Sequence, residues 1–171
     1  MPAPYAAALF DLDGTPIDSY AAIHDALNLT LRHFALEPIA LHRVRRIVGD
    51  GLESLMEKTV GKERQEEGVA IFRKRYAVTG PRMTELLPGA DELTAELERR
   101  DVVMGVVSNK PSYFSVEILE ALGILDRFVI VTLFMAVSAV VFAALFSDDS
   151  VRRLKILRAA YILAALIAAT A

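Results

Sequence analysis

The sequence predicts an α/β fold in which a parallel sheet is interrupted by a long helical insertion. Two apolar runs, residues 6–10 and 102–107, each stop abruptly at polar residues, which is typical of buried strands in a parallel sheet. Between these runs, residues 19–83 carry apolar side chains mostly at helical spacing. Because this stretch separates two strands of the same kind, we interpret it as an insertion into a sheet-forming core.

Composition narrows the classes of function. With 171 residues, the chain is expected to form one domain, or a core with a small insert, and its net charge of -3 does not indicate a nucleic-acid binder. It contains no cysteine, which excludes disulfides, a cysteine nucleophile and thiolate metal sites. Any metal is therefore expected to be a hard, oxygen-bound ion. The first residues do not resemble a secretory signal, so we expect a cytoplasmic protein.

The first strand ends at a pair of acids, Asp11 and Asp13, followed by Gly14 and Thr15. Alternation along an extended backbone points the two carboxylates the same way. Converging carboxylates at the end of a buried strand repel each other, and a divalent cation or a shared proton is the usual compensation. A helix N-cap would explain one acid and the threonine, but not the pair. We therefore predict a catalytic site at Asp11 and Asp13.

Helices account for most of the remaining chain up to residue 122. We expect four in the insertion, at residues 20–34, 41–48, 52–59 and 63–76, and two after it, at residues 90–100 and 112–122. Asp18 and Ser19 are good N-caps for the first helix. The second helix is basic on one side, where Arg46 lies, and it leads into a flexible turn at Gly49 and Gly51.

The second strand ends at Ser108, Asn109 and Lys110. The Ser108 hydroxyl and nearby backbone N–H groups can donate hydrogen bonds to a phosphate, and Lys110 adds positive charge. Alternatively, Ser108 and Asn109 only cap the helix that follows. Open parallel sheets bind ligands outside the carboxyl ends of their strands. The acid pair at the end of the first strand therefore favours the phosphate site.

Together these motifs resemble the haloacid dehalogenase (HAD) superfamily of phosphatases, and within it the phosphoglycolate phosphatase branch. The likeness extends over about residues 6–128 and rests on the segments Phe10-Asp11-Leu12-Asp13-Gly14-Thr15, Arg46-Ile47-Val48-Gly49-Asp50-Gly51-Leu52, Leu87-Pro88-Gly89, Val106-Val107-Ser108-Asn109-Lys110-Pro111 and Leu119-Glu120-Ala121-Leu122-Gly123-Ile124. The resemblance implies a Rossmann-like parallel-sheet core built from residues 1–18 and 85–128, with an all-helical cap over residues 19–84.

The resemblance also implies an activity, the hydrolysis of a small phosphomonoester such as phosphoglycolate through an aspartyl-phosphate. Asp11 would be the nucleophile, and Asp13 would protonate the leaving alkoxide and then activate water. The cofactor would be Mg²⁺, with Asp11, Asp13 and Asp149 as its metal-binding residues.

Two further groups of residues receive roles from the resemblance. Ser108, Asn109 and Lys110 would form the phosphate-binding group. Arg46, Gly49 and Gly51 would belong to a cap loop that closes over the substrate. Arg46 could meet a substrate carboxylate, although a solvated surface charge is the simpler explanation.

The sequence departs from the family pattern in two places. Pro16 replaces an apolar residue beside the nucleophile loop. The family's third motif, a lysine that bridges nucleophile and phosphate, is missing, because no lysine lies between Lys110 and Lys155. We therefore expect reduced activity. The alternative is a catalytically impaired relic that binds phosphate or a partner, or that is tethered to a membrane.

Residues 129–171 form an apolar tail with two interpretations. The uncharged run 129–146 just reaches the length of a membrane-spanning helix, about 17 to 25 residues, and we favour a helical, membrane-prone tail. The other interpretation is a degenerate core with a strand at residues 129–131 and a remnant of the metal motif at Asp149. A basic stretch at residues 152–158 argues against simple membrane insertion by the positive-inside rule. The sequence does not indicate an oligomeric state.

Overall fold

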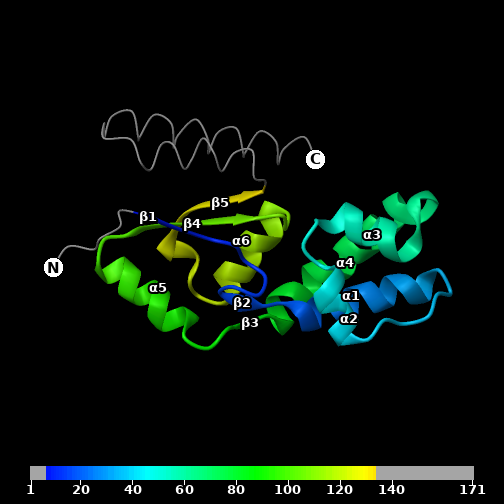
Figure 1. Ribbon diagram of the computed structural model, residues 1–171, viewed down its shortest axis with the longest axis horizontal. Coiled ribbons are helices and arrows are strands. Elements are labelled where there is room, and N and C mark those ends of the chain that lie inside the picture. The colour runs from blue at the N-terminus through cyan, green and yellow to red at the C-terminus, as the bar shows by residue number, and fades with distance from the viewer. Residues whose placement is uncertain (1–6, 134–171) are drawn as a thin grey trace.

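The computed structural model describes residues 7–133 and places a sheet-containing part and a helical part end to end (Figure 1). The sheet contains the described strands β1 (Ala7–Phe10), β4 (Val103–Ser108) and β5 (Phe128–Leu133), in the order β1-β4-β5. Both pairs of neighbours are parallel, with Phe10 opposite Val106 and Ser108 opposite Leu133. The predicted α/β fold with a parallel sheet is confirmed.

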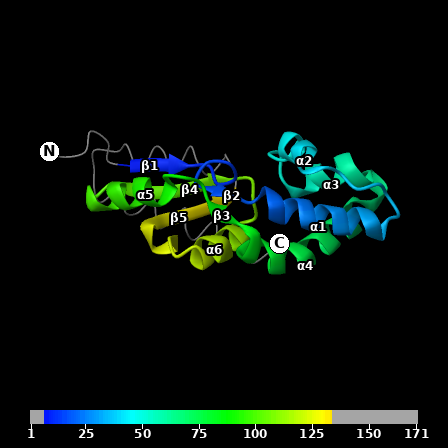
Figure 2. The ribbon, with the colours of Figure 1, turned by 90° about the horizontal axis from the view of Figure 1, so that it is seen from below.

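The helical part, which we call the helical insertion, comprises the elements α1 (Tyr20–His33), α2 (Leu41–Ile47), α3 (Leu52–Val60), η1 (Lys62–Arg64) and α4 (Gln65–Met83). Two short strands flank it, β2 (Ile17–Asp18) and β3 (Glu85–Leu86), and they pair antiparallel. Because these strands pair, the chain leaves the sheet-containing part and returns to it at neighbouring points. Figure 2 shows α1 and α4 side by side beyond one end of the sheet.

The four helices predicted for the insertion are confirmed, but the predicted end of the last one is wrong. α4 continues past Tyr76 to Met83, through Gly80 and Pro81. Glycine and proline both disfavour a helix interior. Packing of α4 along α1 outweighs that local preference, because most helical stability in proteins comes from tertiary contacts.

Two helices outside the insertion cover the sheet. α5 (Ala90–Arg99) and α6 (Ser112–Ala121) lie on one side of it, and η2 (Leu125–Arg127) leads into β5 (Figure 1). The buried apolar side chains form one cluster that runs from the sheet-containing part into the insertion, with Leu12, Val106 and Leu119 at one end and Leu27 and Met56 at the other. The two parts therefore share one core.

Two predictions about the strands need correction. β1 is only partly buried, because it lies at the edge of the described sheet and Leu9 is 37% exposed. Residues 128–133 form β5, so the single helix over residues 129–146 that we favoured is wrong at its start, and the alternative strand at residues 129–131 is confirmed. The other residues of the tail, Asp149 among them, lie outside the described residues. None of the described helices is long and apolar enough to cross a membrane.

Candidate active site

The acid pair lies in a tight turn that follows β1. The Gly14 N–H donates to the Ile17 carbonyl at 2.8 Å, and the Thr15 N–H donates to the Leu12 carbonyl at 3.2 Å. Gly14 has a φ of 82°, which favours glycine. Leu12 is fully buried, and the two acids on either side of it reach the same cavity, as alternation predicts. The chain continues into β2 rather than into a helix, so the N-cap alternative is wrong.

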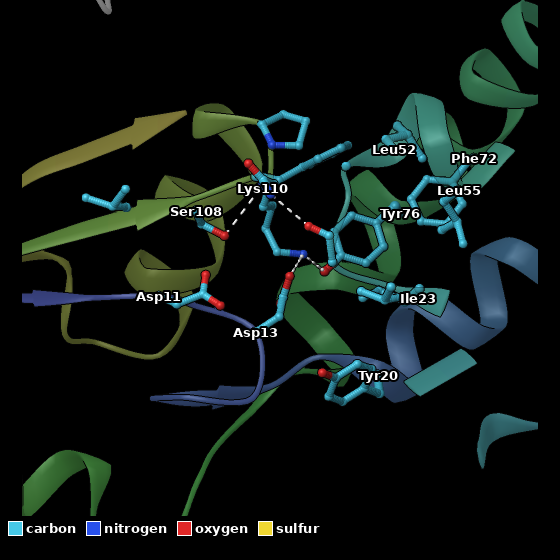
Figure 3. A pocket seen from close by; sticks show the side chains of 17 residues that line it. Asp11, Asp13, Tyr20, Ile23, Leu52, Leu55, Phe72, Tyr76, Ser108 and Lys110 are labelled. Carbon is cyan, nitrogen blue, oxygen red and sulfur yellow. Dashed lines mark hydrogen bonds and ion pairs between the residues drawn. The ribbon is translucent and has the colours of Figure 1, made fainter. Parts of the chain in front are cut away.

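A cavity of about 460 Å³ opens at the carboxyl ends of β1 and β4 (Figure 3). Most of the predicted site residues line it, namely Asp11, Asp13, Gly49, Gly51, Ser108, Asn109 and Lys110. The exposed side chain of Arg46 is not part of the lining. The predicted contact of Arg46 with a substrate in this cavity therefore has no support in the structure. Asp149 lies outside the described residues.

The two acids have different surroundings. Asp11 is exposed to the cavity, and no side chain in the described part of the chain bonds to its carboxylate. Asp13 is held at both oxygens: Oδ1 accepts a short hydrogen bond from the Ser19 hydroxyl, and Oδ2 lies 3.1 Å from Lys110 Nζ. One carboxylate is thus open to a ligand, while the other is fixed in place.

Ser19 belongs to the site, although the sequence pattern predicted it to be a helix N-cap. It stands at the N-cap position of α1 but makes no side-chain capping bond, so the prediction that Ser19 caps this helix is wrong. Asp18 instead accepts a hydrogen bond from the Tyr20 N–H at 3.1 Å. The turn at Gly14 brings Ser19 back to Asp13, and this fold-dependent contact outweighs the local preference for capping.

Lys110 is a buried cation, and its side chain is 6% exposed. Its Nζ donates to the Tyr76 hydroxyl at 2.8 Å and lies 4.6 Å from the centre of that ring (Figure 3). Burial alone would lower the pKa of Lys110, but Asp13 and Tyr76 outweigh it and raise that pKa above its usual value. Burial also raises the pKa of Tyr76, which keeps its hydroxyl neutral.

Ser108 lies at the end of β4, and its hydroxyl faces the same region as the acid pair (Figure 3). Its oxygen accepts a hydrogen bond from the Lys110 backbone N–H at 3.4 Å. The N-cap of α6 is Pro111, and no side chain caps that helix. The interpretation of Ser108 and Asn109 as simple helix caps is therefore wrong.

The loop after β4 also contacts the helical insertion. Asn109 Nδ2 donates to the Gly49 carbonyl at 2.8 Å. Gly51 has a φ of 92°, and a Cβ there would lie 3.8 Å from the Asn109 carbonyl. A side chain at position 51 would therefore have enough space, and it is the positive φ that favours glycine there. Asn109 and Gly49 join the two parts of the molecule at the rim of the cavity.

The donor set fits a hard divalent ion. In the described residues no group of three His, Cys, Asp or Glu side chains could hold a metal. Asp11 and Asp13 nevertheless lie together at one edge of the cavity, and within the described part of the chain the Asp11 carboxylate has no side-chain partner. Mg²⁺ is commonly bound by one or two carboxylates together with water and substrate phosphate oxygens. The acid pair therefore fits Mg²⁺ bound together with a phosphorylated ligand.

Comparisons with known proteins agree with this geometry. The model of the haloacid dehalogenase-like hydrolase family matches residues 8–140. A phosphoglycolate phosphatase from Aquifex aeolicus is 36% identical over 120 residues, which cover 70% of this chain and 56% of the relative. One from Vibrio parahaemolyticus is 33% identical over 130 residues, with 70% and 57% covered.

Solved structures show the same fold. A haloacid dehalogenase-like family hydrolase from Streptococcus pneumoniae superposes with a TM-score of 0.70 at 26% identity, covering 76% of this chain and 61% of that one. A predicted phosphatase from Clostridium acetobutylicum gives 0.69 at 25% identity, with 75% and 60% covered. This chain therefore spans less than two thirds of the length of the relatives it matches.

Proposed function

Because this chain belongs to the haloacid dehalogenase-like hydrolase family, we propose that its cavity hydrolyses a small phosphomonoester. The observation that carries the proposal is the contrast between the two acids. A nucleophile must be open to its substrate, as Asp11 is, and an acid–base group must be held in place, as Asp13 is by Ser19 and Lys110.

The proposed reaction has two steps. In the first, an Asp11 oxygen forms a bond to phosphorus while the bond to the leaving oxygen breaks, and Asp13, which must enter this step protonated, gives its proton to the alkoxide. In the second, Asp13 takes a proton from water as the water oxygen attacks phosphorus. This attack releases inorganic phosphate and restores the Asp11 carboxylate.

Other groups stabilise the phosphoryl oxygens in this proposal. Ser108 and the backbone N–H groups after β4 donate hydrogen bonds to them, and Lys110 adds positive charge. Mg²⁺, bound at Asp11 and at the main-chain carbonyl of Asp13, would neutralise further charge on the same oxygens. The family's third motif is missing from the sequence, so we expect slower turnover than in relatives that carry it, on the order of 100-fold.

The relatives named phosphoglycolate phosphatase support a small phosphorylated acid as the substrate. The cavity wall in the helical insertion is largely apolar, with Ile23, Leu52, Leu55 and Phe72 (Figure 3). This wall also fits a phosphomonoester whose organic group is apolar. Comparing kcat/KM for phosphoglycolate and for phenyl phosphate separates these two substrate classes.

The proposed function is tested with 4-nitrophenyl phosphate and Mg²⁺. We expect turnover by the wild-type chain and a loss of more than about 1,000-fold in Asp11→Asn, which keeps the shape of the side chain but removes the nucleophile. Folded wild-type and Asp11→Asn proteins that are equally inactive would overturn the proposal. Such a result would favour the alternative, a catalytically impaired relic that binds phosphate or a partner.

A further inference from the structure

We infer that Tyr76, on α4 of the helical insertion, is a positioning residue that holds Lys110 against Asp13. This inference rests on the proposed phosphatase function and extends it to a residue outside the acid pair and the loop after β4. Through Tyr76, the rate of the acid–base step at Asp13 would depend on the position of the helical insertion.

The first support is a chain of contacts that joins the two parts of the molecule. Lys110 Nζ, from the loop after β4, donates to the Tyr76 hydroxyl at 2.8 Å and lies 3.1 Å from Asp13 Oδ2 (Figure 3). Tyr76 is 1% exposed, and the side chains of Lys110 and Asp13 are 6% and 15% exposed. A charge buried this deeply needs well-placed hydrogen-bond partners. If one partner is removed, water can take its place only after the surrounding side chains move.

The second support is the way the tyrosine ring is held. It stacks on Phe72 with centroids 5.4 Å apart, and the Phe114 ring meets it edge-on at 4.9 Å. Gly80, one turn further along α4, leaves room for the ring, since a Cβ there would lie 3.0 Å from the Tyr76 ring. A glycine inside a helix is unfavourable, so its presence beside this ring indicates that the ring position is specified.

The third support is the donor count of the lysine. An ammonium group has three N–H donors, of which Asp13 and Tyr76 accept two. Among residues 7–133 no further side chain accepts from this group, so the third donor can serve a phosphoryl oxygen in the cavity that Lys110 lines. Tyr76 therefore fixes the direction of a cation that serves both the acid–base residue and the substrate. If α4 moved away from the sheet-containing part, Lys110 would lose this partner.

A purely structural role makes a different prediction. If Tyr76 only fills space, phenylalanine should replace it without loss, because the ring contacts with Phe72 and Phe114 remain. If it positions Lys110, removal of the hydroxyl alone should lower the rate. The decisive variant is therefore Tyr76→Phe. Tyr113→Phe is the matched control, because Tyr113 is 44% exposed on α6 and does not line the cavity.

The test measures steady-state kinetics with 4-nitrophenyl phosphate and Mg²⁺ in folded proteins. For Tyr76→Phe we expect kcat to fall by about tenfold with KM changed less than about threefold, since a hydrogen bond to a charged group is lost and mainly the acid–base step suffers. For Tyr113→Phe we expect no change. In a Lys110→Met background, Tyr76→Phe should cause no further loss, because its effect acts through the lysine.

The outcomes separate this inference from the proposed function. An active wild-type chain whose kcat is unaffected by Tyr76→Phe, or a full extra loss in the Lys110→Met background, would overturn the inference and leave the phosphatase function standing. An inactive wild-type chain would overturn the function. Calorimetric titration with inorganic phosphate then decides the inference: weaker binding by Tyr76→Phe than by wild type supports it, and equal or absent binding refutes it.

Discussion

Replacing Lys110 by methionine should lower the free energy of unfolding at neutral pH. It should also remove the part of that free energy that wild type loses at alkaline pH. The substitution keeps most of the apolar stem of the side chain but removes the ammonium group. Asp13 thereby loses its ion-pair partner, and the Tyr76 hydroxyl loses the hydrogen bond that it accepts from Lys110. Breaking a buried ion pair by removing one partner costs about 3 to 5 kcal/mol. Asp13 borders a cavity, where water can reach it, so we expect a loss of about 2 to 3 kcal/mol at pH 7.

The sign of the pH dependence follows from the raised pKa of Lys110 in the folded state. A group whose pKa is higher when folded contributes stability that is fully present below its unfolded pKa, about 10.4 for lysine. That contribution is lost as the pH rises from there through the folded pKa. The difference in unfolding free energy between wild type and Lys110→Met should therefore be constant near neutral pH and shrink above about pH 10.5.

Urea denaturation of both proteins at several pH values measures this difference. Lys58→Met is the matched control, because Lys58 also pairs with an aspartate, Asp50, but both side chains are exposed. Exposed pairs contribute little to stability, so the control should remain close to wild type. A Lys110→Met protein as stable as wild type at pH 7, or a difference that grows above pH 10.5, would refute the reasoning.

Four further predictions concern the rest of the site. Ser19→Ala should lower kcat by about tenfold while leaving KM nearly unchanged, because one oxygen of Asp13 loses its donor; steady-state kinetics beside wild type measure this, and an unchanged kcat would contradict it. Asn109→Ala should raise KM several-fold by releasing the loop at Gly49, and equal KM values would show that this contact is not needed. Gly80→Ala should destabilise the fold by about 1 kcal/mol, because the added methyl group crowds the Tyr76 ring by more than the gain in helix propensity offsets. A melting temperature above that of wild type would show that the Tyr76 ring does not need the space beside Gly80. Removal of divalent ions with EDTA should abolish turnover and added Mg²⁺ should restore it, whereas turnover unaffected by EDTA would exclude the proposed metal.

The residues that could be predicted from the sequence are those whose local pattern carries the information. Asp11 and Asp13 directly follow an apolar strand, and Ser108 directly follows the next one in the sheet. The ends of parallel strands meet at one edge, so the strand pattern alone brings these residues together. The same reasoning explains why the predicted helices agree with the structure to within a few residues, except at the end of α4.

Tyr76 and Ser19 could not be predicted in this way. Tyr76 meets Lys110 across 34 positions of sequence, and only the packing of α4 against α6 brings them together. The signal that could have pointed to Tyr76 is a glycine four residues later, at Gly80, which leaves a large side chain room on the same helix face. Ser19 was misinterpreted because a local rule for helix starts competes with a contact to Asp13 that depends on the turn at Gly14.

The arrangement of contacts explains why the helical insertion and the strand ends work as one site. The insertion reaches the loop after β4 twice, through Gly49 at Asn109 and through Tyr76 at Lys110. The first contact lies at the rim of the cavity and the second is buried beside Asp13. A displacement of the insertion would therefore loosen the cavity rim and the cation beside Asp13 together. In the proposed reaction, this coupling would tie the acid–base step at Asp13 to the position of the helical insertion.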